Sequence, residues 1–138
     1  MSRSILDCSI VMAWFFEDQA DTFTEGVLDE VAADGASVPS IWPLEVANAL
    51  LVGERRNKAS IAESSRFLSQ LSSLRITVDE EAPRRALEQI LELGRNQRLS
   101  AYDAAYLELA MREGLPLATR DESLRKAARA VGVELLKG

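Results

Sequence analysis

Four acidic residues stand at positions where carboxylates often perform chemistry. Asp7 directly follows the short apolar run at residues 4–6, and Glu45, Asp103 and Asp121 each lie in the first turn or at the start of a predicted helix. Carboxylates that converge repel one another, so they must hold protons or bind a cation. The chain has no histidine and one cysteine. The cation would therefore be held by oxygen ligands, which Mg²⁺ and Mn²⁺ prefer.

An oxygen-ligated divalent ion positions a water molecule, lowers its pKa and stabilises charge on a phosphoryl group. The inferred chemistry is metal-assisted phosphodiester hydrolysis. The composition excludes several other classes of site. Without histidine there is no histidine-based triad and no His-ligated zinc centre, and with Cys8 as the single cysteine there is no intramolecular disulfide.

Each acid also has a purely local explanation, because acids near helix N-termini stabilise the helix through capping and the macrodipole. The segment from Ser100 to Asp103 resembles a capping box, and the segment from Thr119 to Glu122 fits a full box. Taken singly, each acid suits a cap or a surface position. The metal site is favoured because all four fall on one predicted edge, and spacing alone leaves both interpretations open.

The elements that must position these acids are short strands alternating with longer helices. This pattern is typical of an α/β domain with a mostly parallel sheet covered on both faces. Right-handed crossovers then bring the carboxyl ends of the strands to one ligand-binding edge. The length of 138 residues predicts one domain, residues 1–138. The expected strands are 4–6, 36–38, 74–78, 115–118 and 133–136, and the expected helices are 9–16, 21–33, 40–55, 60–72, 80–95, 100–113 and 121–131.

Apolar residues recur at helical spacing in these segments. In the helix expected at 80–95, Leu87, Ile90 and Leu91 form the inner face. The apolar run at residues 10–16 is much shorter than the roughly 20 residues of a membrane-spanning helix. It also lacks a basic leader and a cleavage site. We therefore expect a cytoplasmic protein with no membrane contact.

Four stretches of the sequence resemble the PIN domain, specifically that of the VapC-type toxins of toxin–antitoxin pairs. They follow one another in the order of the family over nearly the whole chain. Each motif is weak alone, and four at these spacings are a specific signal. The stretches are Ile5-Leu-Asp-Cys-Ser-Ile-Val-Met-Ala-Trp-Phe-Phe-Glu17, Pro39-Ser-Ile-Trp-Pro-Leu-Glu-Val-Ala-Asn-Ala-Leu50, Leu99-Ser-Ala-Tyr-Asp-Ala-Ala-Tyr-Leu-Glu-Leu-Ala110 and Pro116-Leu-Ala-Thr-Arg-Asp-Glu-Ser-Leu124.

The resemblance implies a PIN-like three-layer α/β/α fold and a Mg²⁺- or Mn²⁺-dependent endoribonuclease acting on RNA such as tRNA or rRNA. It also implies a homodimer, and a small VapB-like antitoxin whose tail blocks the active-site groove. The segment 22–52, with apolar side chains at Phe23, Val27 and Leu50, either presents a groove for an antitoxin helix or belongs to the core.

The resemblance assigns the catalytic and metal-binding positions to the four acids. In the scheme we favour, Asp7, Asp103 and Asp121 ligate the metal, while Glu45 completes the cluster and orients the attacking water. Supporting polar groups are expected from three further residues. These are Thr119 near the fourth acid, Ser9 in the loop after the first, and Asn48 one helical turn after Glu45.

RNA binding also requires cations. Arg95 and Arg98 precede the helix of Asp103, and Arg120 adjoins Asp121, so these three are candidate phosphate contacts; the alternative is scattered surface charge. The net charge of −6 and the lack of a basic stripe predict modest, metal-dependent RNA affinity.

Two other functions remain open at this point. One is a noncatalytic PIN-like binding or assembly module, against which the presence of all four acids argues. The other is a Mg²⁺-dependent phosphohydrolase of small phosphate esters. The sequence has no Asp-x-Asp after the first strand and no P-loop, which argues against the common versions of that class.

Overall fold

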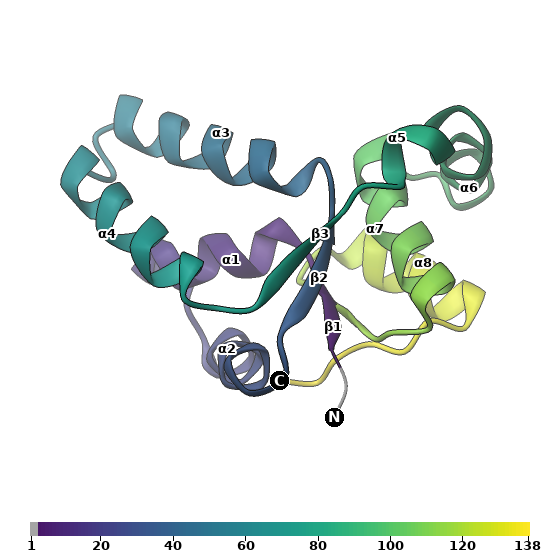
Figure 1. Ribbon diagram of the computed structural model, residues 1–138, viewed down its shortest axis with the longest axis horizontal. Coiled ribbons are helices and arrows are strands. Elements are labelled where there is room, and N and C mark those ends of the chain that lie inside the picture. The colour runs from purple at the N-terminus through teal and green to yellow at the C-terminus, as the bar shows by residue number, and fades with distance from the viewer. Residues whose placement is uncertain (1–2) are drawn as a thin grey trace.

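A four-stranded parallel sheet forms the centre of the molecule (Figure 1), which the computed structural model describes over residues 3–138. The strands are β1 (Ser4–Leu6), β2 (Ala36–Pro39), β3 (Ile76–Asp79) and β4 (Leu117–Ala118). Their spatial order is β3-β2-β1-β4, and all three pairings are parallel. The predicted α/β fold with a parallel sheet is confirmed.

The direction in which the chain adds strands reverses beside β1. From β1 the chain moves outward to β2 and β3, and it then returns to the opposite side of β1 as β4. Open parallel sheets bind ligands outside the carboxyl ends of their strands at such a reversal. The residues that directly follow β1 and β4 therefore occupy the natural binding position of this fold.

Helices cover both faces of the sheet and complete three layers (Figure 1). The segments between β1 and β3 lie on the left of the sheet in that view, and the segments after β3 lie on the right, as crossovers of one hand require. The left-hand group is α1 (Cys8–Phe15), η1 (Glu17–Gln19), α2 (Thr22–Asp34), α3 (Trp42–Arg55) and α4 (Ile61–Ser72). The right-hand group is α5 (Ala82–Arg85), η2 (Ala86–Ile90), α6 (Leu91–Gln97), α7 (Ala101–Glu113) and α8 (Glu122–Val131).

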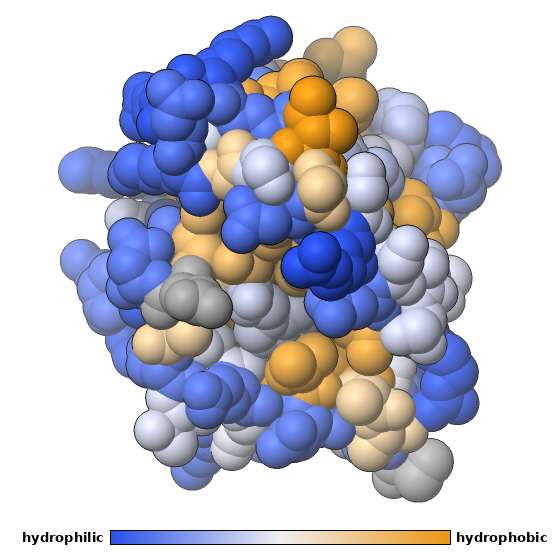
Figure 2. All heavy atoms as spheres, turned by 90° about the vertical axis from the view of Figure 1, so that its left-hand side faces the viewer, coloured by the Kyte–Doolittle hydropathy of each residue, from blue (hydrophilic) through white to orange (hydrophobic). Residues whose placement is uncertain are grey.

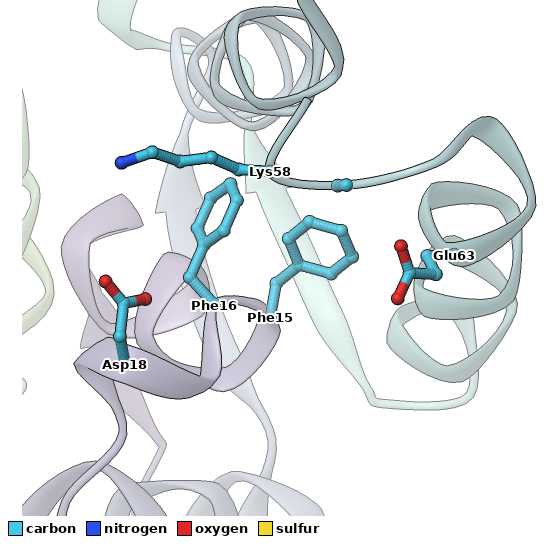
Figure 3. Close-up of a pocket in the computed structure, with 6 residues that line it drawn as sticks. Phe15, Phe16, Asp18, Lys58 and Glu63 are labelled. Carbon is cyan, nitrogen blue, oxygen red and sulfur yellow. The ribbon is translucent and has the colours of Figure 1, made fainter. Parts of the chain in front are cut away.

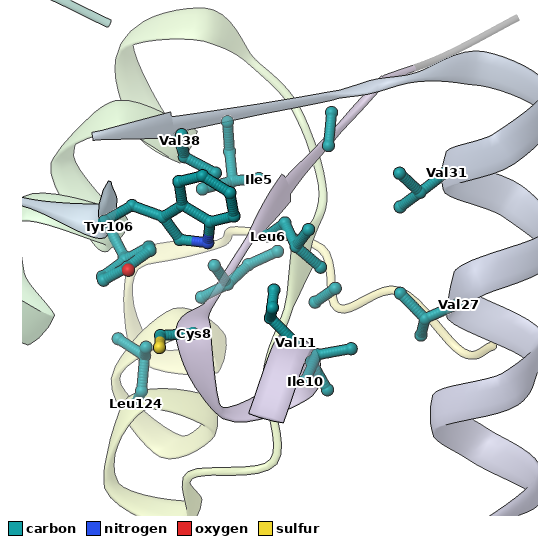
Figure 4. Packing of buried hydrophobic residues seen from close by; sticks show 14 of the residues in the cluster. Ile5, Leu6, Cys8, Ile10, Val11, Val27, Val31, Val38, Tyr106 and Leu124 are labelled. Atoms are coloured by element: carbon teal, nitrogen blue, oxygen red, sulfur yellow. The ribbon is translucent and has the colours of Figure 1, made fainter. Parts of the chain in front are cut away.

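The core lies on both sides of the short strands. Ile5 and Leu6 of β1 are fully buried, because helices cover both faces of the sheet. Figure 4 shows these two side chains beside Val27 of α2 on one side and Tyr106 of α7 on the other. Val27 and Leu50 are core residues, so the idea that their helix faces form a free antitoxin groove is wrong.

The helix expected at 80–95 is present, but only part of its predicted inner face is buried. It runs from α5 to α6 and contains a π-helical turn, η2. A π turn holds one residue more than an α turn and so rotates the following side chains around the axis. As a result Ile90 is buried, whereas Leu87 is 84% exposed and Leu91 is 40% exposed.

The last predicted strand, 133–136, is also wrong. Only an isolated parallel bridge between Leu135 and Leu117 forms there. Since β4 is only two residues long, it offers a neighbouring strand too few backbone partners for a ladder. Within residues 3–138, no helix is both long and apolar enough to cross a membrane.

Candidate active site

Asp7 lies at the centre of the carboxyl edge of the sheet, directly after the inner strand β1. Its backbone N–H donates to the carbonyl of Ala118 in β4 at 3.0 Å, which fixes it against the neighbouring strand. The residue is 6% exposed, and the hydroxyls of Ser9 and Thr119 both donate to the same carboxylate oxygen, Oδ2, at 2.7 Å. No side chain in residues 3–138 donates to Oδ1. One oxygen of Asp7 is therefore held by hydroxyls, while the other has no side-chain donor.

Thr119 joins the two strands at the point of reversal. Its buried hydroxyl donates to Asp7 and accepts a hydrogen bond from the backbone N–H of Asp121 at 3.0 Å. Sequence patterning predicted Thr119 as the N-cap of the last helix, and this is wrong. Asp121 is the N-cap of α8, and its carboxylate accepts from the N–H of Leu124 at 2.9 Å. The Thr119 hydroxyl is therefore available to orient Asp7.

Glu45 lies in the first turn of α3, which starts soon after β2 ends. The phenol of Tyr106, fully buried in α7, donates a hydrogen bond to Oε1 of Glu45. Partial burial raises the pKa of the Glu45 carboxyl; the Tyr106 bond opposes the rise, and the charges of Asp7 and Asp103 add to it. Tyr106 thus fixes the position of a carboxylate that is otherwise electrostatically unfavourable.

Asp103 occupies the first turn of α7, whose N-cap is Ser100. The Ser100 hydroxyl accepts a hydrogen bond from the backbone N–H of Asp103 at 3.1 Å. The Asp103 carboxylate does not accept the reciprocal hydrogen bond from the backbone N–H of Ser100. The expected capping box is thus only half present. Burial, together with the charges of Asp7 and Asp121, raises the pKa of Asp103 to about 6.

We call the four carboxylates the acid edge; the charges of Asp7, Asp103 and Asp121 each help to raise the pKa of a neighbouring carboxyl in this group. Burial is the main cause of the raised pKa of Asp7; bonds from Ser9 and Thr119 oppose it, and the charge of Asp121 increases it. Within residues 3–138, no lysine or arginine nitrogen lies within 4 Å of any of the four carboxylates. The acid edge therefore carries negative charge that the described protein does not neutralise.

The donor set suits a hard divalent cation, because it consists of carboxylate and hydroxyl oxygens. Cys8 adjoins the edge, but burial, with the charges of Glu45 and Asp7, raises the pKa of its thiol to about 12, so the thiol stays protonated. In residues 3–138, no three acidic or thiol side chains stand close enough to enclose one ion. The oxygens thus have the right chemistry and a shared edge, without a closed cage.

A groove lies between α1 and α3, and none of the four acids lines it. A cavity of about 360 Å³ includes Met12 in α1 and Ala49 in α3, the latter one helical turn after Glu45. It adjoins a second cavity of about 480 Å³ at the end of α1. Figure 3 shows the rings of Phe15 and Phe16 in this second cavity, with charged side chains around them. Figure 2 shows that apolar and hydrophilic side chains interleave on the face of the molecule over the left-hand helices.

Comparison with known proteins now adds to this geometry. Residues 4–130 match the PIN domain family. The chain belongs to the PIN domain family. This match covers most of the chain.

Three relatives illustrate the similarity of this PIN domain to known proteins. It is 36% identical over 94 residues to Exonuclease VapC9 of Pyrobaculum aerophilum, covering 67% of each chain. The structure of PAE2754 from the same organism superposes with a TM-score of 0.67 at 23% identity, over 91% of this chain and 86% of that one. The structure of VapBC2 from Rickettsia felis bound to a DNA fragment from their promoter gives a TM-score of 0.66 at 16% identity, over 96% of each chain.

The remaining candidate residues of this PIN domain, Asn48 and the three arginines, have different surroundings from the four acids. Asn48 is exposed and makes no side-chain hydrogen bond within residues 3–138. Arg120 is occupied elsewhere: its guanidinium donates to the carbonyl of Gln19 and lies 3.5 Å from the carboxylate of Asp21. Arg95 and Arg98 are exposed. The bonds made by Arg120 argue against its predicted phosphate contact.

Sequence reasoning missed Tyr106. The residue lies in the quoted stretch Tyr102-Asp-Ala-Ala-Tyr106, one turn after Asp103, and it was not singled out. A tyrosine amid the alanines and leucines of a buried helix is a usable signal, because a buried phenol requires a hydrogen-bond partner. Glu45 is that partner.

Proposed function

We propose that this PIN domain is the ribonuclease toxin of a VapC-type toxin–antitoxin pair, and that it hydrolyses RNA phosphodiester bonds with Mg²⁺ or Mn²⁺ at the acid edge. The observation that supports the proposal is that four carboxylates, none with a lysine or arginine nitrogen within 4 Å in residues 3–138, follow the strands near the reversal of the sheet. Membership of the PIN family and the 36% identity to a VapC exonuclease support the class of reaction.

In this proposal Asp7, Glu45, Asp103 and Asp121 hold the metal. A bound divalent ion supplies a water of lowered pKa and offsets charge on the phosphoryl group. Ser9 and Thr119 hold Asp7 in one orientation through their bonds to Oδ2. Tyr106 holds Glu45, whose carboxylate orients the attacking water and accepts its proton.

The partner in this proposal is a small antitoxin that binds across the groove between α1 and α3. Apolar side chains of the antitoxin would cover Phe15 and Phe16, and its chain would continue past Ala49 to the acid edge. The similar structure titled VapBC2 supports a two-protein system of this kind. If a short open reading frame lies immediately upstream of the gene, co-expression with its product should give a complex that cleaves RNA far more slowly than the free protein.

A homodimer acting in the cytoplasm completes the proposal. Light scattering of the purified protein should give twice the mass of one chain, 15.2 kDa. A monomeric mass at the concentrations used for RNA cleavage would contradict the dimer without affecting the nuclease.

The decisive assay incubates the purified protein with linear RNA, covalently closed circular RNA and a small phosphate ester, in Mg²⁺, in Mn²⁺ and in chelator. We expect metal-dependent cleavage of both RNAs and no ester hydrolysis. Cleavage of linear RNA alone would indicate an exonuclease, because a circle has no end. Ester hydrolysis without RNA cleavage would favour the phosphohydrolase. Cleavage of none of the three by protein shown to be free of partner would favour a noncatalytic module.

A further inference from the structure

A polar pocket lies between the end of α6 and one face of α8. Its volume is about 370 Å³. Asn96, Gln97 and Arg98 line one wall, and Ser123 and Lys126 line the other, which continues along small alanine side chains of α8. Both helices belong to the right-hand layer in Figure 1. The lining therefore combines two cations, two amides and a hydroxyl, all of which can donate hydrogen bonds.

The two cations of this pocket have no acidic partner. Neither Arg98 nor Lys126 has a carboxylate within 4 Å in the part of the chain that the structure describes, and both are exposed. By contrast, Arg129 on the same helix α8 lies 3.8 Å from Glu122. In a chain of net charge −6, two unpaired cations around one pocket form a local site for an anion.

The backbone at Arg98 is unfavourable for its side chain. Arg98 is the C-cap of α6 with φ 56° and ψ 44°, the left-handed region where glycine or asparagine is usual. A residue with a Cβ costs roughly 1 kcal/mol in this conformation. Glycine would serve the fold better here. The arginine side chain is thus not needed for the turn.

The residues that line the pocket are close in sequence to two of the four acids. Arg98 lies two residues before Ser100, the N-cap of the helix that carries Asp103. Ser123 lies two residues after Asp121, and Lys126 lies about 7.5 Å further along the axis of α8 than Asp121. An RNA strand whose scissile phosphate lies at the acid edge would therefore place a neighbouring phosphate within reach of this pocket.

We propose that Arg98 and Lys126, with Asn96, Gln97 and Ser123, bind a backbone phosphate of the RNA substrate next to the one that is cut. The inference rests on the proposed function, since it names a subsite of the same nuclease. Contacts of this kind position a strand without reading its sequence, so the pocket contributes affinity and register rather than base specificity.

The test measures the binding of a short fluorescein-labelled single-stranded RNA to the Asp7→Asn protein in Mg²⁺, over a series of salt concentrations. We expect Arg98→Gly and Lys126→Gln to weaken binding about fivefold each. Each should also reduce the slope of log K against log salt by about 0.7, the value for one phosphate contact on a single strand. Arg129→Gln removes the same charge from α8 outside the pocket and should change neither quantity.

Two further measurements separate this role from a structural one. Arg98→Gly should unfold at the same temperature as the wild type or higher, because it relieves the left-handed backbone. In the otherwise wild-type enzyme, both variants should raise KM for RNA cleavage with little change in kcat, as expected for lost uniform binding.

The outcomes are distinguishable from failure of the proposed function. RNA cleavage with unchanged binding and KM in both variants would overturn the pocket and leave the nuclease intact. Equal losses in Arg129→Gln would also overturn it, since they would show only a dependence on overall charge. Absence of RNA binding by the Asp7→Asn protein, with an unchanged KM in the active variants, would overturn the pocket as well. The cleavage assay alone decides whether the nuclease proposal stands.

Discussion

Acids end two strands of the same sheet, and their surroundings are opposite. Asp7 follows β1 and belongs to the acid edge with three other carboxylates. No lysine or arginine nitrogen in residues 3–138 lies within 4 Å of it. Asp79 ends β3, and the guanidinium of Arg112 binds it through two hydrogen bonds of 3.1 and 2.8 Å. We call this second group, Asp79 and Arg112 with Glu108 and Arg85, the arginine cluster.

The arginine cluster is a neutralised arrangement. Arg112 also binds the buried Glu108 at 2.9 and 3.0 Å, and Arg85 lies 3.3 Å from the same carboxylate. The hydrogen bonds from Arg112 lower the pKa of Asp79, and those same bonds to Asp79 and Glu108 raise the pKa of Arg112. At the acid edge the carboxyl pKa values move in the opposite direction.

The difference distinguishes acids that are paired within the fold from acids that are not. A carboxylate with a bound arginine stabilises the fold and has little capacity left for a ligand. Under the proposed function, the unpaired carboxylates of the acid edge would be offset by a bound cation. Helix α7 takes part in both groups, since it carries Asp103 and Tyr106 as well as Glu108 and Arg112. The predictions below alter one group at a time.

The largest effect is expected from Asp7→Asn on RNA cleavage. The substitution keeps the shape of the side chain and removes the buried negative charge at the centre of the acid edge. We expect kcat/KM to fall about 10³-fold, the order seen when one charge-stabilising group is lost. The melting temperature should not fall, because a buried unneutralised charge has been removed. Wild-type cleavage by the folded variant would contradict the site.

The next largest effect is expected from Arg112→Met on stability. Removing this arginine leaves Asp79 unpaired and Glu108 buried with Arg85 alone, which should cost about 3 kcal/mol of unfolding free energy. Urea denaturation measures the loss. Arg129→Met is the matched control, because its partner Glu122 is 81% exposed, and it should cost less than about 0.5 kcal/mol. Equal losses in the two variants would show that the cluster has no special role.

Tyr106→Phe should have an intermediate effect, confined to the acid edge. The ring stays in the core, while Glu45 loses the hydrogen bond that orients it. We expect Mn²⁺ affinity and kcat to fall about tenfold, the effect typical of losing a group that holds a metal ligand. Tyr102→Phe, at an exposed position, is the control and should leave both unchanged. Unaltered Mn²⁺ affinity in Tyr106→Phe would remove Tyr106 from the site.

The smallest expected effect is the pH dependence of stability in the metal-free protein. Asp103 has its pKa raised to about 6, above the ordinary value for aspartate. The folded state therefore binds this proton more tightly than the unfolded state, so the contribution of Asp103 to stability decreases as pH rises from about 4 to about 6. Asp79, with a lowered pKa, contributes in the opposite sense: its stabilisation is present above about pH 4 and is lost as pH falls.

Denaturation in chelator at pH 7 tests this difference. Because Asp103 is half-exposed and solvent screens it, we expect Asp103→Asn to stabilise the protein by only about 1 kcal/mol at pH 7, with the gain disappearing near pH 4. Arg112→Met should instead lower the free energy of unfolding most at neutral pH and less in acid. If Asp103→Asn were less stable than the wild type at pH 7, the result would contradict the interpretation that the acid edge destabilises the metal-free protein.

Much of this fold was predictable from the sequence because its signals are local. Strand β1 and the acid that follows it could be placed from a three-residue apolar run ending at Asp7. The parallel order followed from strands alternating with helices. The prediction of a strand at 133–136 was wrong because the segment depends on β4, which is two residues long and forms only an isolated bridge with it. The prediction that Leu87 is buried was wrong because a π-helical turn cannot be recognised from the spacing of apolar residues.

The candidate site was predictable in its residue types but not in its contacts. Thr119 was expected near the acids from the family resemblance, whereas its bond to Asp7 spans 112 positions of the chain and requires the β1–β4 pairing. Arg120 adjoins Asp121 in sequence, but it binds Gln19 and Asp21, which only the fold brings near. The metal-binding and catalytic roles of the four acids, and the supporting role of Asn48, stay predictions.

Titration of the metal-free protein with Mn²⁺ by calorimetry at pH 7, for the wild type and Asp7→Asn side by side, tests the central claim most directly. The account predicts saturable binding by the wild type, a rise in its melting temperature on saturation, and at least tenfold weaker binding by the variant. Absence of Mn²⁺ binding to the wild type, or equal affinity in the two proteins, would contradict the acid edge as the metal site of this nuclease.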